Sequence, residues 1–275
     1  MEALPGLPYG GAMQTRTIGD HLREWRQRRR LSQLDLALAA EISTKHLSFL
    51  ETGRAQPSRE MVLRLAQELD VPLRDRNVLL VAAGYAPVFA QRALDDPALQ
   101  AARTAVDLVL KGHEPYPALA VDRHWHLVAH NAGIARLIAS ASPQLLRPPV
   151  NVLRLSLHPE GLAPRIENLP EWRAHLLARL RQQIDATADA GLTTLLEELA
   201  AYPAPGSAKA ARMNVTQDYA GVVVPLRFAT EAGTLSLFST TTIFGTPVDV
   251  TLAELAIESF FPADAATAAL LQKLI

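Results

Sequence analysis

The chain has 275 residues, of which 49% are hydrophobic and 20% charged, and its formal net charge is −1. A domain usually has about 100–200 residues, so this length predicts two domains, each with enough apolar side chains for a core. The absence of cysteine excludes disulfides and cysteine-ligated zinc. The chain shows neither a signal-peptide pattern nor an apolar run of about 18 residues, so we expect a cytoplasmic protein with no membrane partner.

Helical periodicity begins after a predicted flexible lead-in over residues 1–15. Five short helices are predicted over residues 16–86, and residues 1–86 together hold 12 Lys and Arg against 10 Asp and Glu. Thr17 and Ser32 are expected N-caps, because each is followed three residues later by an aspartate. Gly53 follows the third helix, where a left-handed residue commonly ends a helix. This first domain is therefore predicted to be all-α and mildly basic.

The second and third helices of this domain are joined by a tight turn. In the second helix, Leu34, Ala37 and Leu38 share the expected buried stripe. The third helix is expected to turn two leucines inward and a polar face outward. Such a pair of helices is typical of a helix-turn-helix, whose second helix enters the major groove.

The outer face of the third helix carries the residues that are expected to contact DNA bases. Thr44, Lys45 and Ser48 fall on one side, opposite Leu47 and Leu50. Short hydrogen-bonding groups and one cation can reach base edges. With the helix N-termini and flanking polar side chains added, the DNA-contact candidates are Ser32, Gln33, Ser43, Thr44, Lys45, Ser48, Arg54 and Arg59.

The residues alone leave two points open in this domain. The arginine-rich run at residues 26–30 is compatible with phosphate contact, and equally with cations that stabilise a helix C-terminus. Gln33 is placed either to touch a phosphate or to support the recognition helix. Patterning alone also permits a plain five-helix bundle with solvated polar faces.

The second half of the chain mixes strands and helices. Residues 87–114 are predicted to connect the domains, with a helix over residues 97–111. Residues 115–275 form the second domain. Its predicted strands span residues 118–121, 126–129, 219–228, 234–244 and 250–261, with helices between the first two and the last three. This order predicts an α+β domain in which helices pack across one antiparallel sheet of about five strands.

Several segments resemble known regulators. The segment SQLDLALAAEISTKHLSFLETGRAQPS resembles the XRE type of helix-turn-helix, although Glu41 stands where many relatives have glycine. The segments ETGRAQPSREMVLRLAQELDVPLRDRNVLLVAAGYAP, ALAVDRHWHLVAHNAGIARL and NVLRLSLHPEGLAPRIENLPEW resemble the MmyB-like branch of these regulators. The resemblance implies DNA binding and a PAS-like second domain. It also implies a small apolar ligand, with a fatty acid as the leading candidate.

A ligand pocket is expected between the sheet and the helices. Its candidate apolar lining is Trp125, Leu127, Ile134, Leu137, Leu153, Leu157, Leu176, Leu180, Phe228, Leu237 and Phe238, each of which is equally compatible with ordinary core. A carboxylate at the mouth would need a donor, for which Asn131, Arg154 and His158 are the candidates.

Other chemistry has weaker support in the sequence. His124, His126 and His130 lie close together, but no cysteine or H-E-x-x-H pattern supports a metal site, and no metal is expected. The nucleophile-elbow, phosphate-loop and dinucleotide motifs are absent, so we expect no catalytic residue and no obligatory cofactor. The leading hypothesis is a homodimeric, ligand-responsive regulator of a pseudo-palindromic operator. Two alternatives stay open: a DNA-tethered enzyme, and a second domain that serves only dimerisation.

Overall fold

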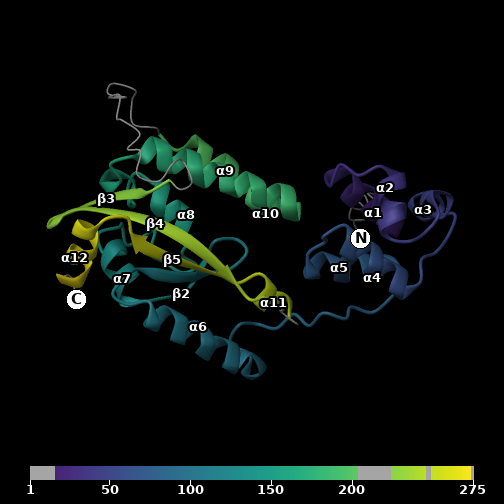
Figure 1. Cartoon of the computed structure of the whole chain (residues 1–275), viewed down its shortest axis with the longest axis horizontal. Coiled ribbons are helices and arrows are strands. Elements are labelled where there is room, and N and C mark those ends of the chain that lie inside the picture. Colours follow the sequence, from purple (N-terminus) through teal and green to yellow (C-terminus); the bar gives the residue numbers. More distant parts are fainter. Residues whose placement is uncertain (1–15, 204–223, 246–248, 274–275) are drawn as a thin grey trace, which may run out of the picture. The chain divides into compact units, whose positions relative to one another are not determined.

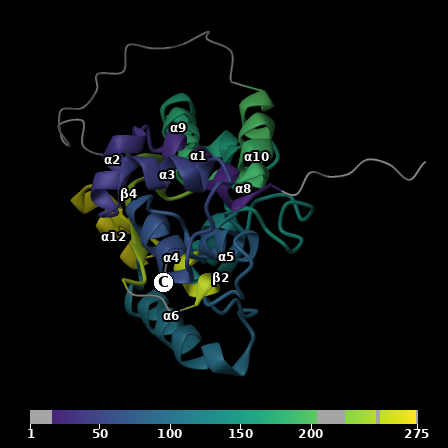
Figure 2. The ribbon, with the colours of Figure 1, turned by 90° about the vertical axis from the view of Figure 1, so that its right-hand side faces the viewer.

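The chain divides into two compact units, Met1–Phe89 and Ala90–Ile275. The computed structural model describes residues 16–203, 224–245 and 249–273. The predicted lead-in over residues 1–15 and the first half of the predicted strand over residues 219–228 lie outside these ranges. Figures 1 and 2 show the elements of each unit, and the two units are described separately below.

The first unit contains the five predicted helices. They are α1 (Ile18–Arg28), α2 (Gln33–Ala39), α3 (Thr44–Glu51), α4 (Arg59–Glu68) and α5 (Leu73–Ala82). In the described part of this unit, four helices begin at a hydroxyl that accepts the backbone N–H three residues on: Thr17, Ser32, Ser43 and Ser58. Each such cap satisfies a backbone donor that the helix itself cannot. The predicted all-α domain is confirmed.

The buried face of α2 differs from the prediction. Leu34 and Leu38 are 65% and 77% exposed, whereas Leu36 and Ala37 are buried. The sequence of α2 is QLDLALA, in which five of the seven residues are apolar. Spacing in so apolar a segment fits more than one stripe, so it does not select a face. The prediction was right for Ala37 and wrong for both leucines.

The turn between α2 and α3 keeps its tight geometry despite the departure from glycine. Glu41 has a φ of 55° and so lies in the left-handed region. For a residue with a Cβ this conformation costs about 1–2 kcal/mol. Gly53, at the end of α3, has a φ of 71°, as its position after the helix predicted. The glutamate thus carries local strain to preserve the turn.

The second unit contains a five-stranded antiparallel sheet in its described residues. The strands are β1 (Ala118–Val121), β2 (Leu127–His130), β3 (Leu226–Thr230), β4 (Gly233–Ile243) and β5 (Ala256–Pro262), in the order β2-β1-β5-β4-β3. The helices are α6 (Gln100–Gly112), α7 (Ala132–Ile138), α8 (Val152–Leu157), α9 (Leu169–Thr187), α10 (Ala190–Ala201), α11 (Val250–Ala253) and α12 (Ala265–Lys273), with short 3-10 turns at Pro97–Leu99 and Ala163–Arg165. The predicted PAS-like α+β architecture is confirmed.

The last predicted strand begins later than expected. Residues 250–253, which were predicted to be extended, form the short helix α11 instead. The Asp249 side chain accepts a hydrogen bond from the Thr251 N–H at 2.9 Å and caps this turn. Val250 is fully buried at its start. The cap and the buried anchor favour a helical turn, and β5 begins only at Ala256.

The two faces of the sheet carry different helices. In β1, Leu119 and Val121 belong to the larger core, which includes side chains of α8, α9 and α10. Ala118 and Ala120 belong to a smaller core with Val106 of α6. The alternation follows from the two-residue period of a strand. In both views α9 and α10 lie side by side, across the sheet from α6 (Figures 1 and 2).

Candidate nucleic-acid interface and ligand cavity

The outer face of α3 has the polarity expected of a reading surface. Thr44 and Ser48 are half-buried and Lys45 is exposed. Leu47 and Leu50 are fully buried beneath them. The two leucines fix the helix to the unit, and the opposite side presents hydroxyls and an ammonium.

Phe49 organises two cations next to this face, a role that sequence reasoning missed. The Lys45 Nζ atom lies 5.7 Å from the centroid of the Phe49 ring, and the Arg54 Cζ atom lies 5.9 Å from it. A cation over an aromatic face is attracted by the ring quadrupole. The spacing K-x-x-x-F, one helical turn, is the signal that could have revealed the first contact.

Glu51 at the end of α3 ties together three helices. Its side chain is fully buried. The Arg26 Nε and Nη2 atoms of α1 donate to its two oxygens at 2.6 and 2.9 Å. The Gln33 amide of α2 donates to Oε2 at 2.9 Å, and Arg23 approaches within 3.8 Å. Of the two roles predicted for Gln33, this contact fits support of the recognition helix.

The charge on Glu51 is favoured despite burial. Burial raises the pKa of this carboxyl. Hydrogen bonds from Arg26 and Gln33, together with the charges of Arg26 and Arg23, outweigh that effect, so the pKa lies below its usual value. The carboxylate therefore stays ionised and holds α3 in place at neutral pH.

The arginine run at residues 26–30 braces the first unit. Besides holding Glu51, Arg26 donates to the Leu31 carbonyl at 2.9 Å. Arg29 donates to the carbonyls of Leu69 and Asp70, both at 2.8 Å. These contacts are internal to the unit. The Ser32 and Ser43 hydroxyls serve as caps, whereas the side chains of Arg54 and Arg59 are exposed.

An apolar cavity lies inside the second unit. Its volume is about 90 Å³, and leucine and aromatic side chains form most of its wall. The predicted residues that line it are Trp125, Leu127, Ile134, Leu137, Leu153 and Leu176. Leu119, Ile138, Val152, Leu155, Leu162, Trp172, Leu226 and Phe260 complete the apolar wall. Its lining suits the aliphatic part of a small ligand.

The structure places the other predicted ligand residues elsewhere. Leu157, Leu180, Phe228 and Leu237 are buried in the adjoining core. Phe238 stacks on Phe261.

The three predicted carboxylate donors also have other partners. Asn131 is buried and caps α7. Arg154 forms an ion pair with Glu198 at 2.7 Å, and the His158 ring packs edge-on against Tyr202. Among the described residues, none of these three side chains lines the apolar cavity.

The polar wall of the cavity is formed by Ser156, Arg179, Ser239 and Glu258. Arg179 Nη1 donates to Glu258 Oε2 at 3.0 Å, and its Nη2 contacts Oε1 of the same carboxylate. The Thr241 hydroxyl also donates to Glu258 Oε1, at 2.9 Å. Sequence reasoning missed this pair, because its members stand 79 positions apart.

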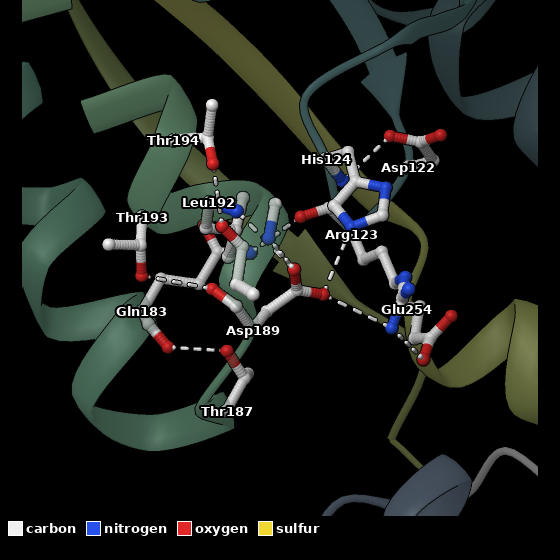
Figure 3. Close-up of polar contacts among 12 residues, drawn as sticks. Asp122, Arg123, His124, Gln183, Thr187, Asp189, Leu192, Thr193, Thr194 and Glu254 are labelled. Carbon is white, nitrogen blue, oxygen red and sulfur yellow. Dashed lines mark hydrogen bonds and ion pairs between the residues drawn. The ribbon is translucent and has the colours of Figure 1, made fainter. Parts of the chain in front are cut away.

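A polar network surrounds the turn between β1 and β2 (Figure 3). Asp189, which caps α10, lies 3.0 Å from His124 Nε2 and 3.2 Å from Arg123 Nη1. Arg123 also lies 3.9 Å from Glu254. Burial raises the pKa of Asp189, but His124, Arg123 and the Gly191 N–H outweigh it, so the pKa is lowered. The network therefore joins the turn to the start of α10 and the end of α11.

The three clustered histidines face different partners. His124 contacts Asp189, His126 lies 3.0 Å from Asp122, and His130 lies 3.0 Å from the Asn131 carbonyl. Within residues 16–203, 224–245 and 249–273, no group of three His, Cys, Asp or Glu side chains is arranged to hold a metal ion.

In those ranges, no helix is both long and apolar enough to cross a membrane.

The fold and these surfaces define a DNA-binding transcription regulator with a separate ligand-binding unit. Residues 22–75 match the helix-turn-helix family. Residues 102–274, more than half of the chain, match the MmyB-like transcription regulator ligand binding domain. The chain belongs to the family of MmyB-like transcription regulators, as the sequence resemblance predicted.

Two relatives match about a third of this chain and most of their own length. The HTH-type transcriptional regulator DdrOP3 of Deinococcus deserti is 36% identical over 107 residues, which are 35% of this chain and 83% of that protein. The clp gene regulator ClgR of Corynebacterium glutamicum is 28% identical over 36% of this chain and 90% of its own, with a TM-score of 0.22. The TM-score is too low to support a structural comparison.

Proposed function

We propose that the chain acts as a homodimer that binds a pseudo-palindromic operator, and that a small apolar ligand in its second unit changes operator affinity. A fatty acid is the first candidate for the ligand. The observation that carries the proposal is this cavity, because apolar side chains form most of its wall. An aliphatic chain placed there would be removed from water.

In the proposed complex, two copies of α3 occupy half-sites about one helical turn of DNA apart. Thr44 and Ser48 would read base edges and Lys45 a base or phosphate. Ser32, Gln33, Ser43, Arg54 and Arg59 remain candidates for backbone contacts. A ligand that favours one placement of the two α3 helices would alter affinity. A coupling of about 1–3 kcal/mol is sufficient for regulation.

Substitution on the outer face of α3 tests DNA reading. We expect Thr44→Ala to weaken binding to a selected operator by about 1–3 kcal/mol and to relax specificity at one base pair. Lys45→Ala should reduce the slope of log affinity against log salt by about one if the ammonium meets a phosphate. Fluorescence anisotropy at several salt concentrations measures both. The control is Lys111→Ala on α6, and unchanged binding in both α3 variants would place the reading face elsewhere.

Native mass spectrometry of the gently purified protein tests the cavity. We expect a bound adduct with the mass of an acyl-chain compound. Leu176→Trp should abolish it, because the larger side chain fills the cavity, whereas Leu108→Trp, at an exposed position of α6, should retain it. If the unsubstituted protein carries no adduct and binds neither added laurate nor added dodecanol, the alternative in which the second unit serves only dimerisation is favoured.

A further inference from the structure

A second cavity adjoins the apolar cavity and has a different character. Its volume is about 230 Å³, and it is lined by Val121, Asp122, Arg123, Trp125, Arg179, Gln183, Glu254 and Ala256. We call it the polar cavity, because five of these eight side chains are charged or amide groups. Trp125 and Arg179 line both cavities. The side chains of Trp125 and Arg179 therefore form a wall that the two cavities share.

The wall is a stacked pair held at its edges. The Arg179 guanidinium lies 4.7 Å from the centroid of the Trp125 ring. The indole N–H of Trp125 donates to Gln183 Oε1 at 2.7 Å. Trp125 has a left-handed φ of 66°, a costly conformation for a residue with a large side chain. The backbone strain is thus located at the residue that divides the cavities.

The charges around both cavities are already matched. Arg179 is paired with Glu258 on the apolar side. On the polar side Arg123 is paired with Asp189 and lies near Glu254. Asp122 Oδ1 accepts the backbone N–H groups of His124 and His126, each at 2.8 Å. An anionic ligand would have to compete with these carboxylates for the arginines, and its charge would lose solvation without a free counterion.

We infer that the preferred ligand is an acyl compound with an uncharged polar head, such as a hydroxyl-bearing ester. Its chain occupies the apolar cavity and its head the polar cavity. There Arg123 and Gln183 can donate hydrogen bonds, and Asp122 and Glu254 can accept them. Such a ligand parts the stacked side chains of Trp125 and Arg179. This inference rests on the proposed function, since it assigns the head group of the same apolar ligand.

Competition among three twelve-carbon probes tests the inference. The probes are 1-monolauroylglycerol, dodecanol and laurate, bound to the intact protein and measured by displacement of a fluorescent acyl probe. We expect 1-monolauroylglycerol to bind about tenfold or more tightly than laurate, because only laurate brings an anion to a charge-matched site. Laurate binding as tightly as 1-monolauroylglycerol overturns the inference and leaves apolar ligand binding intact. If none of the three binds, the proposed function itself fails.

Charge substitutions in the polar cavity provide a second readout. Glu254→Gln removes one competing carboxylate and should tighten laurate binding. Arg123→Gln removes a cation and should weaken it, and dodecanol affinity should change less than twofold in both variants. Glu231→Gln, at the exposed hairpin turn between β3 and β4, is the matched control. Equal responses of laurate and dodecanol to both cavity variants would show that the head group does not lie in the polar cavity.

Discussion

Glu51→Ala is expected to destabilise the first unit by about 3–5 kcal/mol, since it leaves the largely buried Arg26 guanidinium without its carboxylate. The Gln33 amide also loses its acceptor. Hydrogen exchange of backbone amides over residues 17–83 in the intact chain measures the effect separately from the second unit. Glu24→Ala is the matched control. Its carboxylate is 38% exposed and pairs with Arg16 and Arg28 at the surface, so a loss below about 1 kcal/mol is expected.

Acid should reduce the contribution of Glu51. Its folded-state pKa is lowered, so its stabilisation is complete above the unfolded pKa of about 4.3 and is lost as pH falls through the folded value. The difference in protection between the unsubstituted protein and Glu51→Gln should therefore shrink below about pH 4. A difference that stays constant down to pH 2 would assign the effect to packing and not to charge.

Arg179→Ala is expected to destabilise the second unit by about 3–5 kcal/mol. The Glu258 side chain is 5% exposed, and without Arg179 its charge retains only the Thr241 hydroxyl among the contacts described above. Exchange of backbone amides in β4 and β5 measures the loss. Arg227→Ala is the control, because its pair with Glu167 is about one-third exposed on both sides and should contribute less than about 1 kcal/mol.

A double substitution separates the effect of lost charge from the effect of lost side-chain volume at Arg179 and Glu258. Arg179→Met combined with Glu258→Leu removes both charges and keeps similar volumes, so most of the stability should return. If the double variant is as unstable as Arg179→Ala, the arginine contributes mainly by packing on Trp125. Recovery of stability would also give a protein in which ligand preference can be measured without this ion pair.

Local signals predicted the helices well. In the caps at Thr17 and Ser32 the two partners are three residues apart, so a short window of sequence contains both of them. The face of α2 was predicted wrongly for Leu34 and Leu38, because an almost wholly apolar helix gives no contrast between its sides. Burial there is decided by α3 and α4, which pack on α2 from later in the chain.

The residues of a candidate site could be predicted from the sequence only where they all lie on one helix. Thr44, Lys45 and Ser48 lie on a single helix, so their common face follows from helical geometry. The wall of the apolar cavity comes from strands and helices between residues 119 and 260. Arg154 was predicted to be a donor for a ligand carboxylate, but it pairs with Glu198, which lies 44 positions away in the sequence. Pairings at such separations depend on topology, which side-chain patterns do not encode.

The order of strands has a consequence for how the protein is made. Strand β1 is complete at Val121, yet its inner neighbour β5 begins only at Ala256. At the usual speed of a ribosome, about 5–20 residues per second, β1 waits on the order of ten seconds for that neighbour. The helical unit lies within the first 89 residues. The first unit of a nascent chain can therefore fold while the second unit is still being synthesised. Until β5 has been made, one edge of β1 is unpaired, and such an edge is a site that a chaperone would bind.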